Sequence, residues 1–240
     1  GASRLFPWAG IDFNAKLYLS DKNNKLRSWD GAATTLTTVS DGVKTGVTML
    51  AFEGHILVVH YYNHTGATEH RRSMAWSEVS DGDVWTAAVT NQAGDMDFIE
   101  DASDAMTAAT LGQFLLAVYK ESSIYLVNKI GGTFVMERRL IVQGIGAISP
   151  RAVVNLGDRH LIWGVDGFYQ FDGQSVQQMR SPVEDFVFSD MAPKKRRFIR
   201  STILGEFSEA IWAYVPTAAS DSRPDKLVCY NYLEGTWSTR

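Results

Sequence analysis

One basic run is the strongest concentration of charge in the sequence. Lys194, Lys195, Arg196, Arg197 and Arg200 place five positive charges within seven residues. Such a run favours contact with a phosphate backbone or with an acidic surface of a partner. A solvated loop in front of a strand is an equally good interpretation of the same residues. We therefore single out these five residues as a candidate interface.

Two further groups have residue types that bind metals. His60 and His64 are four residues apart, but the local pattern is a strand that enters a loop, which favours surface histidines. The acidic run lacks the central Gly and the terminal Glu of an EF-hand loop, so we interpret it as a solvated loop between repeat units. Its carboxylates are Asp95, Asp97, Glu100, Asp101 and Asp104. We predict no metal site.

Familiar motifs for catalysis and cofactor binding do not occur in the sequence. Cys229 is the only cysteine, so an intrachain disulfide and a cysteine-based metal cluster are excluded, and its apolar surroundings predict a buried thiol. The sequence has no Gly-x-Ser-x-Gly elbow, no HExxH, and neither a P-loop nor a dinucleotide fingerprint. We expect no catalytic residue and no cofactor.

Composition limits the class of protein. The chain has 240 residues, of which 45% are apolar, so it can form a sizeable core. Its net charge of −4 argues against a nucleic-acid binder that acts by charge neutralisation. No apolar run approaches the ~20 residues that a membrane-spanning helix requires, so we expect no membrane span.

The elements that must position these residues read as strands. Apolar residues occur in runs of four to eight that are rich in Val, Ile, Tyr, Phe and Trp and bounded by Gly, Asp, Asn and Ser. The best helical candidate is residues 97–110, for which a turn or connecting loop is equally plausible. The chain is therefore predicted to be all-β.

A repeat organises these strands. Gly54, Gly112, Gly157 and Gly205 each precede an apolar strand, at spacings of 58, 45 and 48 residues. A second strand that ends near a Gly turn follows in each unit. These spacings suit a four-stranded propeller blade, because a sheet with aromatics on both faces must be covered on both sides. A β-sandwich is the rival fold, but it explains the spacing less well.

We predict a single β-propeller domain, residues 1–240, of about five to six four-stranded blades. The approximate repeat units are 1–44, 45–95, 96–145, 146–195 and 196–240. The first unit is short of an inner strand and the last is short of an outer strand, so either the N-terminal segment closes the ring or the chain is part of a longer propeller. Two polar insertions, residues 63–73 and 216–226, are predicted to form long hairpin tips on one rim.

A series of short motifs between about residues 70 and 240 resembles a family of tailed-phage virion proteins. The motifs, in order, are a Trp-Ser strand end, a Ser-Ile-Tyr strand, a Gly-x-x-Ser-Pro step, an Asp-Gly hairpin and a late Tyr-Asn-Tyr strand. They fall at Trp76–Ser77, Ser123–Tyr125, Gly146–Pro150, Asp166–Gly173 and Tyr230–Ser238. This family includes the tail nozzle, or packaged-DNA stabilisation, proteins of short-tailed phages.

The resemblance implies a non-enzymatic structural protein of the virion tail, assembled in the cytoplasm of the host bacterium. It implies a homo-oligomeric ring of six copies around the DNA exit channel, which lets DNA pass non-specifically and helps retain it. Its partners would be the portal-adaptor and the tail fibre or spike proteins, and Lys194, Lys195, Arg196, Arg197 and Arg200 would make an intersubunit or DNA-facing contact. The alternatives are a glycan-binding or glycan-cleaving surface propeller and a kelch-like interaction scaffold.

Overall fold

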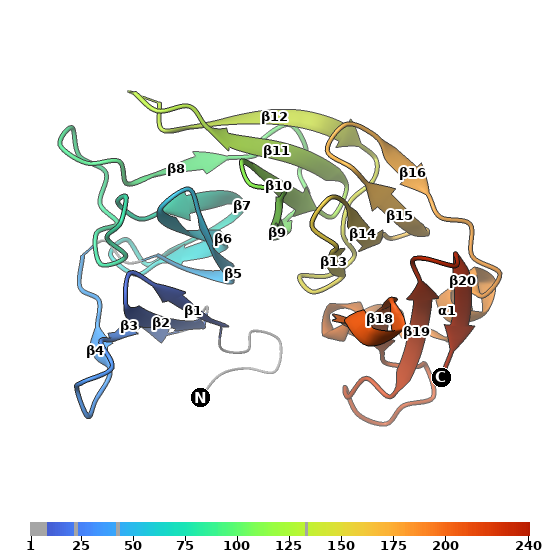
Figure 1. Cartoon of the computed structure of the whole chain (residues 1–240). Coiled ribbons are helices and arrows are strands. Elements are labelled where there is room, and N and C mark those ends of the chain that lie inside the picture. Colours follow the sequence, from blue (N-terminus) through green and yellow to red (C-terminus); the bar gives the residue numbers. More distant parts are fainter. Residues whose placement is uncertain (1–8, 22–23, 42–43, 133) are drawn as a thin grey trace.

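The computed structural model describes residues 9–21, 24–41, 44–132 and 134–240, which form five four-stranded antiparallel sheets (Figure 1). Each sheet is built from four strands that are consecutive in the sequence. The first three sheets contain β1 (Ala9–Phe13), β2 (Lys16–Asp21), β3 (Asn24–Trp29) and β4 (Thr37–Thr38); β5 (Lys44–Phe52), β6 (His55–Asn63), β7 (Thr68–Trp76) and β8 (Gly94–Asp97); and β9 (Ala105–Leu111), β10 (Leu115–Lys120), β11 (Ser123–Lys129) and β12 (Met136–Gln143). The last two contain β13 (Val153–Asn155), β14 (His160–Trp163), β15 (Phe168–Phe171) and β16 (Val176–Gln178); and β17 (Arg200–Leu204), β18 (Glu209–Tyr214), β19 (Lys226–Asn231) and β20 (Thr236–Thr239).

The sheets are the blades of a β-propeller, as the repeat predicted. The first strands of successive blades contact one another in the order β1, β5, β9, β13 and β17. The blades follow one another along an arc whose two ends are the first and fifth blades (Figure 1). Strand pairing in the described part of the chain stays within each blade.

The expected gaps at the two ends of the repeat are wrong. The first blade has an inner strand, β1, which pairs with β2 across a turn in which Asn14 and Ala15 both have positive φ. The fifth blade has an outer strand, β20, which pairs with β19. Both strands have only four or five residues, too few to show a clear apolar alternation. The idea that the N-terminal segment closes the ring concerns residues 1–8, which lie outside the described residues.

The repeated glycines lie in the turns between the first and second strands of blades two to five. Gly54, Gly112 and Gly157 have φ between 62° and 96°, a region that glycine enters without steric cost. Gly205 differs, because it begins a short 3-10 helix, η2 (Gly205–Phe207), and Ser208 takes the positive φ of 54° instead.

The two insertions differ from each other. Residues 63–73 were expected to form a polar tip, but they mostly extend β6 and β7, leaving only residues 64–67 as the turn. Residues 216–225 do form a loop, before β19 begins at Lys226. Both insertions connect the second strand of a blade to the third.

The helical alternative for residues 97–110 is wrong, because residues 98–104 are a loop and β9 follows. Nearly continuous burial along β9 shows why an alanine-rich segment becomes a strand here, since its side chains pack into two different cores. Helical structure instead occupies the linker between the fourth and fifth blades, as α1 (Glu184–Asp190) and the 3-10 helix η1 (Pro193–Phe198).

The central strands of the second and third blades supply apolar side chains to two different cores. On β10, Leu116 and Val118 pack with the second blade, whereas Ala117 and Tyr119 pack with the fourth. The third core lies between the first and second blades and includes the fully buried Trp85, from the loop after β7. This two-sided burial explains why the strands read as continuous apolar runs rather than as alternating patterns.

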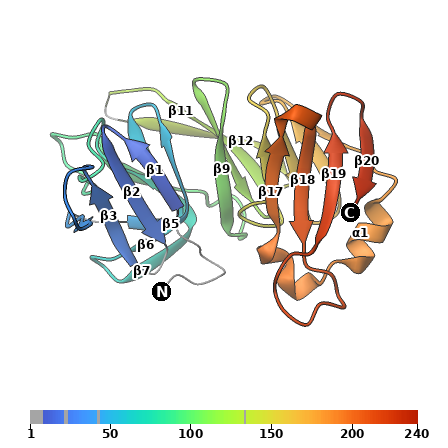
Figure 2. The same ribbon diagram turned by 60° about the horizontal axis from the view of Figure 1, so that its bottom comes forward.

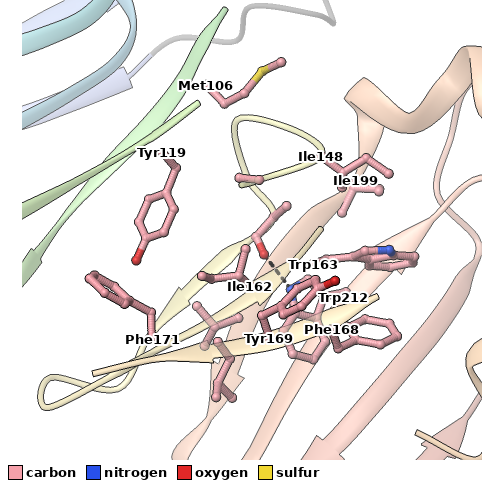
Figure 3. Packing of buried hydrophobic residues seen from close by; sticks show 14 of the residues in the cluster. Met106, Tyr119, Ile148, Ile162, Trp163, Phe168, Tyr169, Phe171, Ile199 and Trp212 are labelled. Carbon is pink, nitrogen blue, oxygen red and sulfur yellow. Dashed lines mark hydrogen bonds between the residues drawn. The ribbon is translucent and has the colours of Figure 1, made fainter. Parts of the chain in front are cut away.

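The largest core joins blades three, four and five and is rich in aromatic rings (Figure 3). Phe168 lies at its centre, with ring centroids of Trp163, Trp212 and Trp237 at 5.0, 5.5 and 4.8 Å. The indole N–H of Trp212 donates a hydrogen bond to the Ala152 carbonyl at 2.9 Å, which fixes the fifth blade to the linker before the fourth.

Replacing Phe168 with Ala would leave a cavity among these rings. We expect F168A to lower the free energy of unfolding by about 3–5 kcal/mol, measured by denaturant titration. Phe186 on α1 is 52% exposed, so F186A is the matched control and should change stability by less than about 0.5 kcal/mol. Equal effects of the two substitutions would contradict the central role of Phe168.

Candidate functional site

The acidic run surrounds a buried lysine. Lys120, at the end of β10, has a fully buried side chain, and its ammonium group donates to the carbonyls of Phe98 and Asp101, both at 2.8 Å. It also pairs with the Asp101 carboxylate at 3.0 Å. The loop does connect two blades, as expected, but it is not simply solvated. Its contacts with Lys120 hold the second and third blades together.

Asp101 is held in its charged form by this arrangement. Burial would raise the pKa of Asp101, but hydrogen bonds from Ser103, Ser123 and Lys120 outweigh it and lower the pKa to about 2. The side chain is 19% exposed, which suits a charge that is paired rather than offered to a ligand.

The other carboxylates of the run bind separate partners. Asp95 pairs with Lys44 at 2.9 Å, Asp97 accepts from Ser73, and Asp104 pairs with Arg71. Glu100 accepts a hydrogen bond from the Tyr125 hydroxyl at 2.8 Å and pairs with Arg138 at 3.0 Å. Within the described ranges, no group of three or more His, Cys, Asp or Glu residues could hold a metal ion.

His60 and His64 are likewise bound to different groups. His60 sits at a bulge in β6 with φ of 49°, and its Nε2 lies 2.9 Å from the Glu69 carboxylate. The Nε2 of His64 lies 2.8 Å from the Thr45 hydroxyl. The strand geometry thus separates two residues that a helix would have aligned.

His160, to which the sequence assigned no role, is fully buried and forms hydrogen bonds through both ring nitrogens. Its Nε2 lies 2.9 Å from the Thr110 carbonyl, which can only accept, so this nitrogen carries the proton. Its Nδ1 therefore accepts from the Tyr119 hydroxyl at 2.6 Å. Burial lowers the pKa of His160 to about 4. The neutral ring connects the third and fourth blades.

The candidate basic run is divided between structural and exposed residues. Lys195 donates to the carbonyls of Ala219 and Asp221 at 2.9 and 2.6 Å, which fixes the long loop of the fifth blade. Arg196 pairs with Glu121, and Arg200 donates to the Ile199 carbonyl at 3.0 Å. Lys194 and Arg197 are exposed and form no ion pair with any residue that the structure describes.

An axial cavity was not anticipated from the sequence. It has a volume of about 310 Å³ and is lined by residues of all five inner strands. Neighbouring blades are joined at its wall, where the Thr48 and Thr107 hydroxyls lie 3.1 Å apart and Ser201 donates to the Val153 carbonyl at 3.1 Å. Arg151 is its one charged lining residue among those described. Aligning the first strand of each repeat unit would have shown these positions.

Several residues of the sequence motifs stabilise the fold through packing and hydrogen bonds. A Cβ on Gly146 would lie 2.1 Å from the Lys120 carbonyl oxygen, so only glycine fits this step between blades. The Trp76 indole donates to the Gln92 carbonyl at 2.7 Å, and the Tyr169 hydroxyl donates to Asp166 at 2.8 Å. Cys229 is 1% exposed and burial raises its pKa, which confirms the predicted buried thiol.

Removing the Lys120 ammonium would leave the Asp101 charge without its buried partner. We expect K120M to destabilise the protein by about 3 kcal/mol in denaturant titration, and the double variant K120M/D101N to recover part of that loss. A double variant no more stable than K120M alone would show that the lysine acts through packing instead of charge.

The low pKa of His160 predicts acid sensitivity. Because the folded pKa of about 4 lies below the ordinary value of 6.5, the unfolded chain binds a proton more readily as pH falls from 6.5 to 4. This linkage should cost ~3 kcal/mol of stability across that window. NMR titration of the imidazole nitrogens provides the measurement, and a His160 signal that titrates near pH 6.5 would contradict it. His55, whose pKa is also lowered by burial, contributes in the same direction.

Comparison with known proteins identifies the fold. No family model and no curated protein matches the sequence. The structure is similar to BamB from Moraxella catarrhalis, with a TM-score of 0.50 and 10% sequence identity. The match covers 94% of this chain and 58% of the BamB chain. The structure is also similar to the AfRom2 CNH domain at the same TM-score and identity, over 97% of this chain and 83% of that one. In the described residues, no helix is long and apolar enough to cross a membrane. The fold is that of a β-propeller.

Proposed function

We propose that this protein is a non-enzymatic propeller scaffold that works by assembling with other protein surfaces. The observation that carries the proposal is the pair of exposed cations on η1. Lys194 and Arg197 are exposed on η1. Two other residues hold this segment in place, Lys195 through hydrogen bonds and Arg196 through an ion pair. Charges on a fixed segment lose little conformational freedom when a partner binds.

We further propose that the assembly is a ring in the tail of a short-tailed phage. This step is supported by the ordered motifs at Trp76–Ser77, Ser123–Tyr125, Gly146–Pro150, Asp166–Gly173 and Tyr230–Ser238, which resemble those of tail nozzle proteins. A net charge of −4 also suits a channel wall past which DNA slides without sticking. In this proposal the ring encloses the DNA exit channel between the portal-adaptor and the fibres or spikes.

Light scattering tests assembly directly. The wild-type protein is expected to form a closed ring of six copies, alone or when mixed with adaptor rings of short-tailed phages. K194E/R197E should weaken this assembly by about tenfold or more, because like charges replace a complementary contact. A wild-type protein that stays monomeric in both conditions would overturn the proposal.

The matched control is K25E/R27E. Lys25 and Arg27 are exposed on β3 in the first blade, so this variant has the same change in net charge at a different place. If both double variants weaken assembly equally, net charge and not the η1 contact is responsible. Fluorescence anisotropy with duplex DNA separates a DNA-facing role, because loss of phosphate contacts lowers the salt dependence of binding.

A further inference from the structure

The exposed apolar side chains are concentrated at one end of the propeller. We call this end the turn rim, because it carries the turns from first to second and from third to fourth strands; the opposite end, with the second-to-third turns and the linkers between blades, is the linker rim. Of thirteen large apolar side chains that are exposed in the described residues, ten lie on the turn rim. These are Trp29, Leu36, Val89, Phe114, Ile130, Phe134, Ile203, Leu204, Phe207 and Leu233.

The turn rim of the fifth blade holds the densest group. Leu204, Phe207 and Leu233 are 39%, 62% and 76% exposed. They come from two turns that are tied together, since the Tyr232 amide donates to the Ser208 carbonyl at 2.9 Å and the Asn231 side-chain amide donates to the Phe207 carbonyl at 3.2 Å. A fixed apolar surface of this kind favours a protein partner.

The same two turns carry exposed negative charge. Glu206 and Glu234 are exposed, and neither forms an ion pair with a residue in the described part of the chain. The nearby Glu209 is already neutralised by Arg240 at 2.7 Å. We call Leu204, Glu206, Phe207, Leu233 and Glu234 the acidic tip.

The linker rim offers a surface of opposite charge. Lys194 and Arg197 on η1 are exposed, and Phe186 on α1, in the same linker, is 52% exposed. Asp185 is also exposed on α1, so the positive charge of this surface rests on η1. We call Phe186, Lys194 and Arg197 the basic face.

The acidic tip and the basic face cannot meet within one chain. The tip lies at the upper end of the fifth blade in Figure 2, whereas α1 and the linker lie toward its lower end. Two complementary surfaces at opposite ends of one molecule favour head-to-tail contact between copies, which gives a ring when the rotation closes and a filament when it does not.

We propose that the acidic tip of one copy docks on the basic face of the next copy. Phe207 and Leu233 are the apolar anchors, and Glu206 and Glu234 pair with Lys194 and Arg197 of the neighbour. This inference rests on the proposed assembly function and names the second surface of its contact. The partner is a second copy of this chain, because its own η1 supplies the charge that the tip lacks.

A charge swap is the decisive test, with mass and dissociation constant measured by light scattering and sedimentation. E206K/E234K should weaken self-association by about tenfold or more, as should K194E/R197E. The quadruple variant E206K/E234K/K194E/R197E should recover most of the wild-type affinity, since it restores opposite charges at the same contact. Failure of the quadruple variant to recover, with the fold intact by circular dichroism, would overturn the pairing.

Apolar and charge controls use exposed residues of other blades. F207S should weaken self-association by about tenfold, as expected for an anchor, whereas V89S, at a fully exposed residue of the second blade, should not. E137K makes one such Glu-to-Lys change at an exposed residue of β12 in the third blade and should leave self-association unchanged. If the wild type assembles and the tip variants assemble equally well, this inference fails and the scaffold proposal stands. If the wild type stays monomeric, with or without adaptor rings, the scaffold proposal fails with it.

Discussion

Burial of the apolar faces of the sheets is the constraint on which this structure depends. The central strands have apolar side chains on both faces, and a single four-stranded sheet cannot remove both from water. On β10, successive residues alternate between the core shared with the second blade and the core shared with the fourth. Such a blade needs a neighbour on each side, and the arc of blades around an axis provides two neighbours to the second, third and fourth blades.

The polar groups between blades adjust to that constraint. A buried ammonium group such as that of Lys120 is costly to remove from water unless hydrogen bonds and a countercharge replace the solvent. The loop after β8 supplies both, through the carbonyls of Phe98 and Asp101 and the Asp101 carboxylate. The neutral His160 ring joins the third and fourth blades through hydrogen bonds to Tyr119 and Thr110, and it adds no buried charge. Lysine, aspartate and histidine are residue types that suggest catalysis in a sequence, but Lys120, Asp101 and His160 here hold neighbouring blades together.

The surface that remains differs between the two rims. The turns that close the hairpins expose apolar side chains and carboxylates, most densely at the acidic tip, whereas η1 exposes two cations at the opposite rim; among the described residues these tip carboxylates and cations form no ion pair. Because hydrogen bonds tie the two turns of the acidic tip together and Lys195 and Arg196 hold η1 in place, binding at these surfaces would cost little ordering entropy. This division of charge and apolar surface is the basis of the proposal that the propeller is an assembling scaffold.

The sequence by itself determined the all-β class, the repeat and the burial of Cys229, because strand periodicity, turn glycines and apolar runs are local signals. It missed β1 and β20, whose four or five residues carry too little pattern, and it left residues 97–110 open between helix and loop. Only the tertiary structure decided which charges of the basic run stay exposed, since Glu121 and the carbonyls of Ala219 and Asp221 come from distant segments. The axial cavity likewise exists only once five inner strands converge. Pairing between residues far apart in the chain has no local signature, and that physical fact separates what could be predicted from what could not.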